Sequence, residues 1–173
     1  VFPPQPANVT TEGAYGQLSW QTSAGGDRYR RGLYTFAKRT APYAMFTTFD
    51  APSGEACVAR RESSNTPLQA LTLMNDVVFL ETAQALGAEL LREPLSDDAR
   101  VTLLFRRCVT RPPTAEERQL VLRFYEQQRQ RFATGEINPA PLAGAGPGDP
   151  VTRAAWIATA RAVLNLDETI TKN

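Results

Sequence analysis

The sequence predicts an all-α fold: an orthogonal bundle of five or six helices with an irregular, extended N-terminal arm. After residue 27, apolar residues recur at spacings of three and four over most of the chain, which is the period of an amphipathic helix. Prolines and capping residues mark the ends of these stretches, and no hairpin signal joins two alternating segments. Residues 1–27 are rich in Pro, Gly, Thr and Ser and show no helical stripe, which predicts an arm lying over the surface.

The length of the chain favours one helical domain with the arm attached. With 173 residues it can bury a hydrophobic core of its own. We therefore expect the extended arm over residues 1–27 and a helical domain over residues 28–173. Within that domain, residues 134–149 are rich in Pro and Gly and poor in large side chains, which predicts a flexible internal loop.

The first helical pattern follows the arm directly. Tyr29, Leu33 and Phe36 fall on one side of a short helix, which should end before Pro42 because proline disfavours the helical conformation in the residue that precedes it. Residues 41–64 have no sustained period and predict an irregular connection.

The next two helices are defined by a cap and by a break. Asn65 or Thr66 can serve as N-cap of a helix whose first residue is Pro67, a position that proline favours. The pattern breaks at Asn75-Asp76 and then resumes with an apolar seam at 3-4-3 spacing. Two consecutive helices are therefore expected.

The remaining helices carry clear start signals. Ser96 can cap the helix that follows it. Thr114 and Glu117 have the spacing of a capping box, in which each side chain bonds the backbone N–H of the other residue. Asp149-Pro150 predicts the start of the last helix by the same combination of a cap and a following proline.

Charge and residue usage exclude several classes of function. There are 19 basic and 18 acidic residues, so the net charge of +1 gives no broad field, and nucleic acid is not an expected partner. The sequence contains no histidine, so Ser-His-Asp and Cys-His catalysis cannot be built within it. No apolar run approaches the roughly 20 residues that cross a bilayer, so no transmembrane segment is expected. We expect no catalytic residues, no cofactor and no metal site.

The two cysteines leave two alternatives open. Cys57 and Cys108 are too far apart in the sequence for a zinc-binding pair, and neither belongs to a Cys-x-x-Cys-His haem-attachment motif. They can form one disulfide in an oxidising compartment, or they can remain two buried free thiols, and the sequence favours neither.

Charged and aromatic residues are most concentrated between Arg28 and Asn65. Two pairs of arginines in this region can surround carboxylates and form a buried ion network or an anion pocket, because guanidinium groups match the geometry of carboxylate and phosphate. The simpler alternative is that the arginines tie loops to helix ends. The residues concerned are Arg30, Arg31, Asp50, Arg60, Arg61, Glu62 and Asn65.

The arm carries large apolar and aromatic side chains that would be costly to leave in water. We expect Trp20 to pack on the helical body and the Pro-rich first residues to reach a partner protein. The residues expected to make such contacts are Phe2, Tyr15, Leu18 and Trp20.

Ordered motifs along the chain resemble those of a known family. They are Arg30-Arg31-Gly32-Leu33-Tyr34-Thr35-Phe36-Ala37-Lys38-Arg39-Thr40, Phe49-Asp50-Ala51-Pro52, Arg60-Arg61, Asn65-Thr66-Pro67-Leu68-Gln69-Ala70-Leu71, Leu73-Met74-Asn75-Asp76 and Leu164-Asn165-Leu166-Asp167-Glu168. Over nearly its whole length the sequence resembles a family of domains of unknown function at the C-terminus of large secreted proteins of planctomycetes and related bacteria. Those proteins commonly carry a cytochrome-c-like domain near the N-terminus.

The resemblance implies a periplasmic or extracellular location and a setting of electron transfer or polymer breakdown, without an established activity. Together with the exclusions above, it predicts a non-catalytic structural or docking subunit within a cytochrome-containing, membrane-associated electron-transfer assembly. Its expected partners are other protein subunits, with a c-type cytochrome among the candidates. The alternative is a binding or catalytic module acting on an extracellular polymer such as a polysaccharide.

Overall fold

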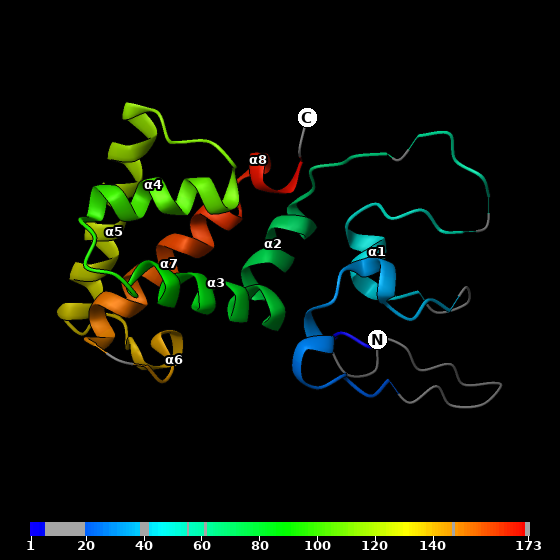
Figure 1. The fold of residues 1–173 in the computed structure, drawn as a ribbon, viewed down its shortest axis with the longest axis horizontal. Coiled ribbons are helices and arrows are strands. Elements are labelled where there is room, and N and C mark those ends of the chain that lie inside the picture. The colour runs from blue at the N-terminus through cyan, green and yellow to red at the C-terminus, as the bar shows by residue number, and fades with distance from the viewer. Residues whose placement is uncertain (6–19, 39–41, 55, 61, 147, 172–173) are drawn as a thin grey trace. The chain divides into compact units, whose positions relative to one another are not determined.

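Figure 1 shows the computed structural model of the chain, which describes residues 1–5, 20–38, 42–54, 56–60, 62–146 and 148–171. Within these residues every regular element is helical, as the sequence predicts: two 3-10 helices, η1 and η2, and the α-helices α1 to α8. The chain divides into two compact units, Val1–Leu71 and Thr72–Asn173. The boundary between these units falls within α2 (Pro67–Asn75).

The first five residues pack within the first unit. The Ser23 backbone N–H donates to the Phe2 carbonyl at 2.8 Å, and the Phe2 N–H donates to Ser23 Oγ at 3.0 Å. The Val1 carbonyl accepts from the Phe36 N–H at 2.8 Å, and the two prolines that follow Phe2 are buried. These Pro-rich residues therefore bond to their own unit, and the expected contact with a partner protein stays a prediction.

A cluster of aromatic rings forms the centre of the first unit. Trp20 stacks on Tyr43, with ring centroids 5.5 Å apart, and meets Phe2 edge-on at 5.2 Å. Phe2 in turn stacks on Phe36 at 5.1 Å, and Tyr43 meets Phe46 edge-on at 5.4 Å. Aromatic pairs at these separations are favourable, so residues that are distant in sequence hold the irregular backbone together.

The short helix predicted after residue 27 is not formed. Its residues make two 3-10 turns, η1 (Gly25–Tyr29) and η2 (Gly32–Tyr34), with Arg30 and Arg31 extended between them. Leu33 is 83% exposed, so the predicted apolar stripe is not buried. Short helices depend on such burial because isolated ones are marginal in water.

A single-turn helix, α1 (Ala44–Thr48), lies in the stretch predicted to be irregular. It ends at Thr48, and Asp50, two residues further on, has a φ of 56° in the left-handed region. The Ala51 N–H donates to the Phe46 carbonyl at 2.8 Å, which is the longer hydrogen bond of a Schellman cap. Asp is one of the few residue types other than glycine that tolerate this conformation.

Helix α2 begins at a predicted cap, and the break between α2 and α3 falls where it was predicted. Thr66 caps α2: its Oγ1 accepts from the Gln69 N–H at 3.3 Å, and Gln69 Oε1 accepts from the Thr66 N–H at 3.1 Å. This is a reciprocal capping box. The break falls at the expected place, because α2 ends at Asn75 and the Asp76 side chain caps α3 (Val77–Leu90) by accepting from its backbone at 2.8 Å.

Two further helices also start at their predicted caps. The Ser96 hydroxyl accepts from the backbone of α4 (Asp97–Cys108) at 3.3 Å. At the start of α5 (Ala115–Ala133), Thr114 Oγ1 accepts from the Glu117 N–H at 3.2 Å and Glu117 Oε2 accepts from the Thr114 N–H at 2.7 Å.

The segment predicted to be a flexible loop contains a short helix and is tied to the helix that follows. The short helix is α6 (Ala140–Ala143), and the next is α7 (Pro150–Leu164), capped by Asp149 as predicted. Arg153 of α7 is buried, and its guanidinium donates to main-chain carbonyls of the segment at 2.9 to 3.2 Å. These carbonyls belong to Ala143, Gly144, Gly146 and Gly148.

Helix α7 lies at the centre of the second unit, where it packs against α3 and α5 and also contacts α4 and α6 (Figure 1). Its Trp156 is fully buried and stacks on Tyr125 of α5, with ring centroids 4.3 Å apart. At Gly87 of α3 a Cβ would lie 2.6 Å from the Ile157 side chain, so only glycine permits this close approach of α3 and α7. The short α8 (Asp167–Ile170) follows α7.

Candidate functional site

Polar side chains gather around the Asp50 carboxylate at the end of α1. Its Oδ2 accepts from the Ser64 backbone N–H at 2.8 Å, the Ser64 hydroxyl at 2.7 Å and Gln69 Nε2 at 3.2 Å. Gln69 is only 2% exposed and also donates to the Thr48 carbonyl and to Ser64 Oγ, both at 3.0 Å. The cluster therefore ties the end of α1 to the start of α2.

These contacts favour a structural role for the Asp50 cluster. The Ser64 hydroxyl donates to Asp50 and accepts from Gln69, so it is held within the cluster by both of its neighbours. Neither Ser64 nor Gln69 was among the predicted site residues. The Thr66-x-x-Gln69 spacing of the capping box was the sequence signal that could have drawn attention to Gln69.

Most of the other predicted site residues lie on the surface of the first unit. Arg30 pairs with Asp27 at 3.0 Å, and both side chains are more than half exposed. The exposed predicted residues also include Arg31, Arg60, Glu62 and Asn65. Those that fall outside the described residues are Arg61, Tyr15 and Leu18.

Cys57 and Cys108 are free thiols in the structure rather than a disulfide. Cys57 is exposed in the first unit, whereas Cys108 is buried at the end of α4 in the second. Burial raises the pKa of the Cys108 thiol to about 11, because the thiolate would lose its hydration. Of the two thiols, only that of Cys108 is buried, and the choice between a disulfide and two free thiols stays a prediction.

Aromatic, aliphatic and basic side chains follow one another along η1 and η2, all exposed except the half-buried Arg28. Tyr29, Leu33 and Tyr34 are 57%, 83% and 49% exposed. We call this stretch the basic–aromatic surface; it comprises Arg28, Tyr29, Arg30, Arg31, Leu33 and Tyr34.

Guanidinium groups lie over the tyrosine rings of this surface. The guanidinium carbons of Arg30 and Arg31 are each 5.9 Å from the centroid of the Tyr34 ring. That of Arg28 is 6.0 Å from the Tyr29 ring. These separations are within the range of cation–π attraction, which helps to hold the exposed side chains together.

The sequence around this surface is strongly basic. Five Arg or Lys residues and one acid, Asp27, lie between Gly25 and Arg39, whereas the whole chain has a net charge of only +1. The positive charge of the chain is therefore concentrated on this segment.

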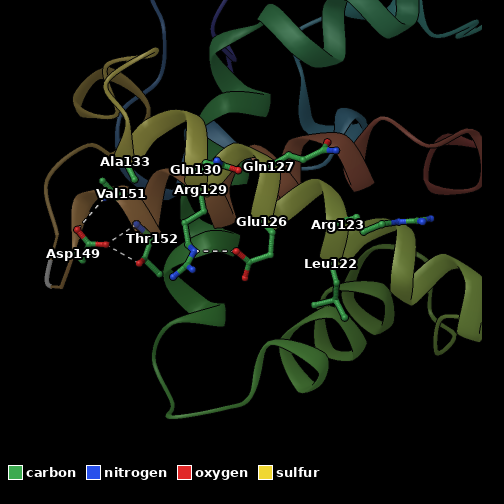
Figure 2. A pocket seen from close by; sticks show the side chains of 10 residues that line it. All are labelled: Leu122, Arg123, Glu126, Gln127, Arg129, Gln130, Ala133, Asp149, Val151 and Thr152. Carbon is green, nitrogen blue, oxygen red and sulfur yellow. Dashed lines mark hydrogen bonds and ion pairs between the residues drawn. The ribbon is translucent and has the colours of Figure 1, made fainter.

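A groove in the second unit, which the sequence analysis did not predict, runs along α5 beside the start of α7 (Figure 2). Its volume is about 980 Å³. The Asp149 carboxylate accepts from the Thr152 hydroxyl at 2.7 Å and from the Thr152 N–H at 2.9 Å, and these bonds lower the pKa of Asp149. Glu126 pairs with Arg129 at 3.2 Å.

Three of the four charged side chains of the groove, Glu126, Arg129 and Asp149, are engaged with their own neighbours, as the dashed lines of Figure 2 show. Asp149 caps α7, and the Glu126–Arg129 pair spans one turn of α5. In the described part of the chain, no three His, Cys, Asp or Glu side chains are grouped so that they could hold a metal ion. None of the described helices has the length and apolar character needed to cross a membrane.

Comparison with known proteins identifies a family. No curated protein and no solved structure matches the chain significantly. The family model described as "PSD1: Protein of unknown function (DUF1553)" matches residues 1–125, which is most of the chain and includes both the Asp50 cluster and the basic–aromatic surface. The chain therefore belongs to the PSD1 family of proteins of unknown function (DUF1553).

Proposed function

We propose that this chain is a non-catalytic, extracytoplasmic docking module whose basic–aromatic surface binds an acidic surface of another protein. The observation that carries the proposal is the exposure of Tyr29, Leu33 and Tyr34 directly beside three arginines. Tyr and Arg are enriched in protein interfaces and among the residues that contribute most to binding.

Leu33 indicates that the partner offers an apolar contact as well as charge. Its side chain is largely in water, and burying apolar surface contributes about 25 cal/mol per Å². The basic segment around it favours an acidic partner, because complementary charge speeds encounter and disfavours wrong partners.

The backbone of the basic–aromatic surface is held in place by contacts within the first unit. The Thr35 N–H donates to the Gly32 carbonyl at 3.0 Å, and Phe36 stacks on Phe2 in the ring cluster. At Gly32 a Cβ would lie 3.1 Å from the Phe46 ring, so the chain passes close to that ring. A supported surface loses less conformational entropy on binding, which favours docking.

The setting that we propose is a cytochrome-containing, membrane-associated electron-transfer assembly in the periplasm or at the cell surface. It is supported by the resemblance of the sequence motifs to domains of secreted proteins with a cytochrome-c-like region. The alternative, a module acting on a polysaccharide, has less support. In the first unit the carboxylate of Asp50 is engaged by Ser64 and Gln69. In the second unit both carboxylates of the groove are engaged, Glu126 by Arg129 and Asp149 by Thr152.

Site-specific photocross-linking of the full chain in native membranes tests the docking proposal. A photoreactive amino acid replaces Leu33, and the control variant carries it at Leu120, which is 61% exposed on α5. We expect one protein to be cross-linked from position 33 and not from position 120. That protein, once purified, should bind the unmodified chain and should bind the Leu33→Ser variant more weakly.

Equal cross-linking from both positions, or no effect of Leu33→Ser on binding, would contradict docking at this surface. A cross-linked partner without haem would contradict the electron-transfer setting and leave the docking role in place. Retention of the chain on a polysaccharide column, lost in the Leu33→Ser variant, would favour the alternative function.

A further inference from the structure

Two guanidinium groups approach the same aromatic ring within the basic–aromatic surface. Arg30 and Arg31 are consecutive residues between η1 and η2, and each guanidinium carbon lies 5.9 Å from the Tyr34 centroid. Two like charges therefore gather around one exposed ring, an arrangement that a bound anion would stabilise.

The two arginines differ in whether a carboxylate of the chain already balances their charge. Arg30 pairs with Asp27 at 3.0 Å, whereas no carboxylate among the described residues pairs with Arg31. Both side chains are exposed, so the Arg31 guanidinium can accept a ligand from solvent. A guanidinium offers a planar fork of N–H donors that matches the two oxygens of a carboxylate.

The backbone beneath these groups is held by local hydrogen bonds. The Tyr34 N–H donates to the Arg31 carbonyl at 2.9 Å, which sets the spacing between the arginine and the ring. The Val1 nitrogen donates to the Tyr34 carbonyl at 2.8 Å, so both ends of the turn are fixed within the unit.

We propose that Arg31, assisted by Arg30 and Tyr34, forms an anchor that binds a side-chain carboxylate of the partner protein. The inference rests on the docking function proposed above and names the chemical group that this surface recognises. Arg31 makes the two-point contact with the carboxylate, and Tyr34 holds the guanidinium by its ring.

The carboxylate could belong to a protein or to an acidic polysaccharide, and the neighbouring Leu33 favours a protein. Its exposed side chain, adjacent to the anchor, matches an apolar residue beside an Asp or Glu of a polypeptide. The anchor is therefore assigned to a protein segment in which acidic and apolar residues are neighbours.

A titration of the full chain with synthetic probes tests the anchor. The probe is an octapeptide of alternating Glu and Leu, the neutral control is the same peptide with Gln in place of Glu, and the polysaccharide probe is oligogalacturonate. We expect NMR shifts of the residue 30–34 amides with the acidic peptide, and an affinity that falls as salt rises. Arg31→Gln should weaken binding at least about tenfold.

Two conservative variants distinguish an anchor from general positive charge. Arg31→Lys keeps the charge but loses the planar fork, so it should bind less tightly than the original chain. Tyr34→Phe keeps the ring and should bind normally, whereas Tyr34→Leu should not. The matched control is Arg129→Gln, which removes an exposed arginine of α5 and should leave binding unchanged.

Three results would overturn the anchor: equal binding of the Gln peptide, equal binding by the Arg31→Gln variant, or tighter binding of oligogalacturonate than of the acidic peptide. Thermal unfolding of each variant, followed by circular dichroism, shows whether it remains folded. The test is separable from the docking test. If cross-linking at position 33 persists in the Arg31→Gln variant, the anchor is wrong and the docking proposal stands. If the acidic peptide binds but position 33 cross-links to no protein, the docking proposal is wrong and the carboxylate site stands.

Discussion

At the scale of single residues, Arg153 shows how one buried cation can organise a segment of chain. Its guanidinium donates to the main-chain carbonyls of Ala143, at the end of α6, and of Gly144, Gly146 and Gly148 in the irregular stretch that follows. Buried backbone carbonyls need such partners, because leaving them unpaired is costly. Arg153 is therefore the reason that a segment rich in Pro and Gly keeps a defined path.

Arg153→Met should lower the free energy of unfolding by about 3 kcal/mol, because four main-chain carbonyls, one buried and three partly buried hydrogen bonds in all, lose their charged donor while the methionine fills part of the space. Chemical denaturation followed by circular dichroism measures the change. The control is Arg107→Met, which removes an arginine with a 58% exposed side chain and should change the free energy by no more than about 0.5 kcal/mol. Similar losses in both variants would show that Arg153 has no special role.

The two thiols should differ sharply in reactivity. Cys57 is exposed, whereas the buried Cys108 has a pKa of about 11 and is protonated at neutral pH, and only the thiolate is a good nucleophile. Titration with Ellman's reagent should therefore detect one fast thiol in the folded chain and two in denaturant. The Cys57→Ser variant should show none in the folded state. Absence of any reactive thiol in denaturant would mean that a disulfide is present.

At the scale of elements, Arg111 links the end of one helix to the starts of two others. It follows α4, and its guanidinium binds Glu117 of α5 at 2.7 and 2.8 Å and Glu168 of α8 at 2.6 and 2.8 Å. Hydrogen bonds from Arg111, and then from the Thr114 backbone, lower the pKa of Glu117 to about 2. Arg111 lowers the pKa of Glu168 as well.

This link predicts a dependence of stability on acid pH. Because the pKa of Glu117 falls from 4.5 to about 2 on folding, its contribution to stability is complete above pH 4.5 and is lost as the pH falls toward 2. Melting temperatures measured across this range should decrease less steeply for Glu117→Gln than for the original chain. Glu116→Gln, at the exposed neighbouring position, is the control and should retain the steep decrease. Identical profiles for Glu117→Gln and the original chain would contradict the link.

At the scale of the whole molecule, the two units are built in different ways. The continuous hydrophobic core is made of residues between Ala83 and Val163, all within the second unit. The first unit depends on stacked rings and on backbone contacts of its first residues, and it carries the proposed docking surface.

The second unit should therefore fold without the first. A fragment of residues 66–173 keeps the Thr66 cap of α2 and the entire continuous core. We expect a helical circular dichroism spectrum and cooperative thermal unfolding, because the buried apolar surface that stabilises this unit is retained. The matched control replaces the buried Leu104 by Ala in the same fragment and should melt at a lower temperature. A fragment with a random-coil spectrum would show that the core depends on the first unit.

The amino-acid sequence by itself determined the helical class and most helix starts. The caps at Thr66, Ser96, Thr114 and Asp149 were predicted at the residues where the structure has them. Capping is local: the side chain bonds a backbone N–H two or three residues away, so the sequence contains both partners. The sequence alone likewise excludes His-based catalysis within this chain, because it contains no histidine.

Tertiary structure alone decided what the charged and aromatic residues of the first 71 positions do. The sequence could not show that Asp50 binds Ser64 and Gln69, that Val1 bonds to Phe36, or that the stripe containing Leu33 is left exposed. Such contacts join residues that the irregular backbone brings together. No short-range periodicity encodes them, because they depend on the path of the chain and on the rings that hold it, whereas helix periodicity and caps depend only on neighbours.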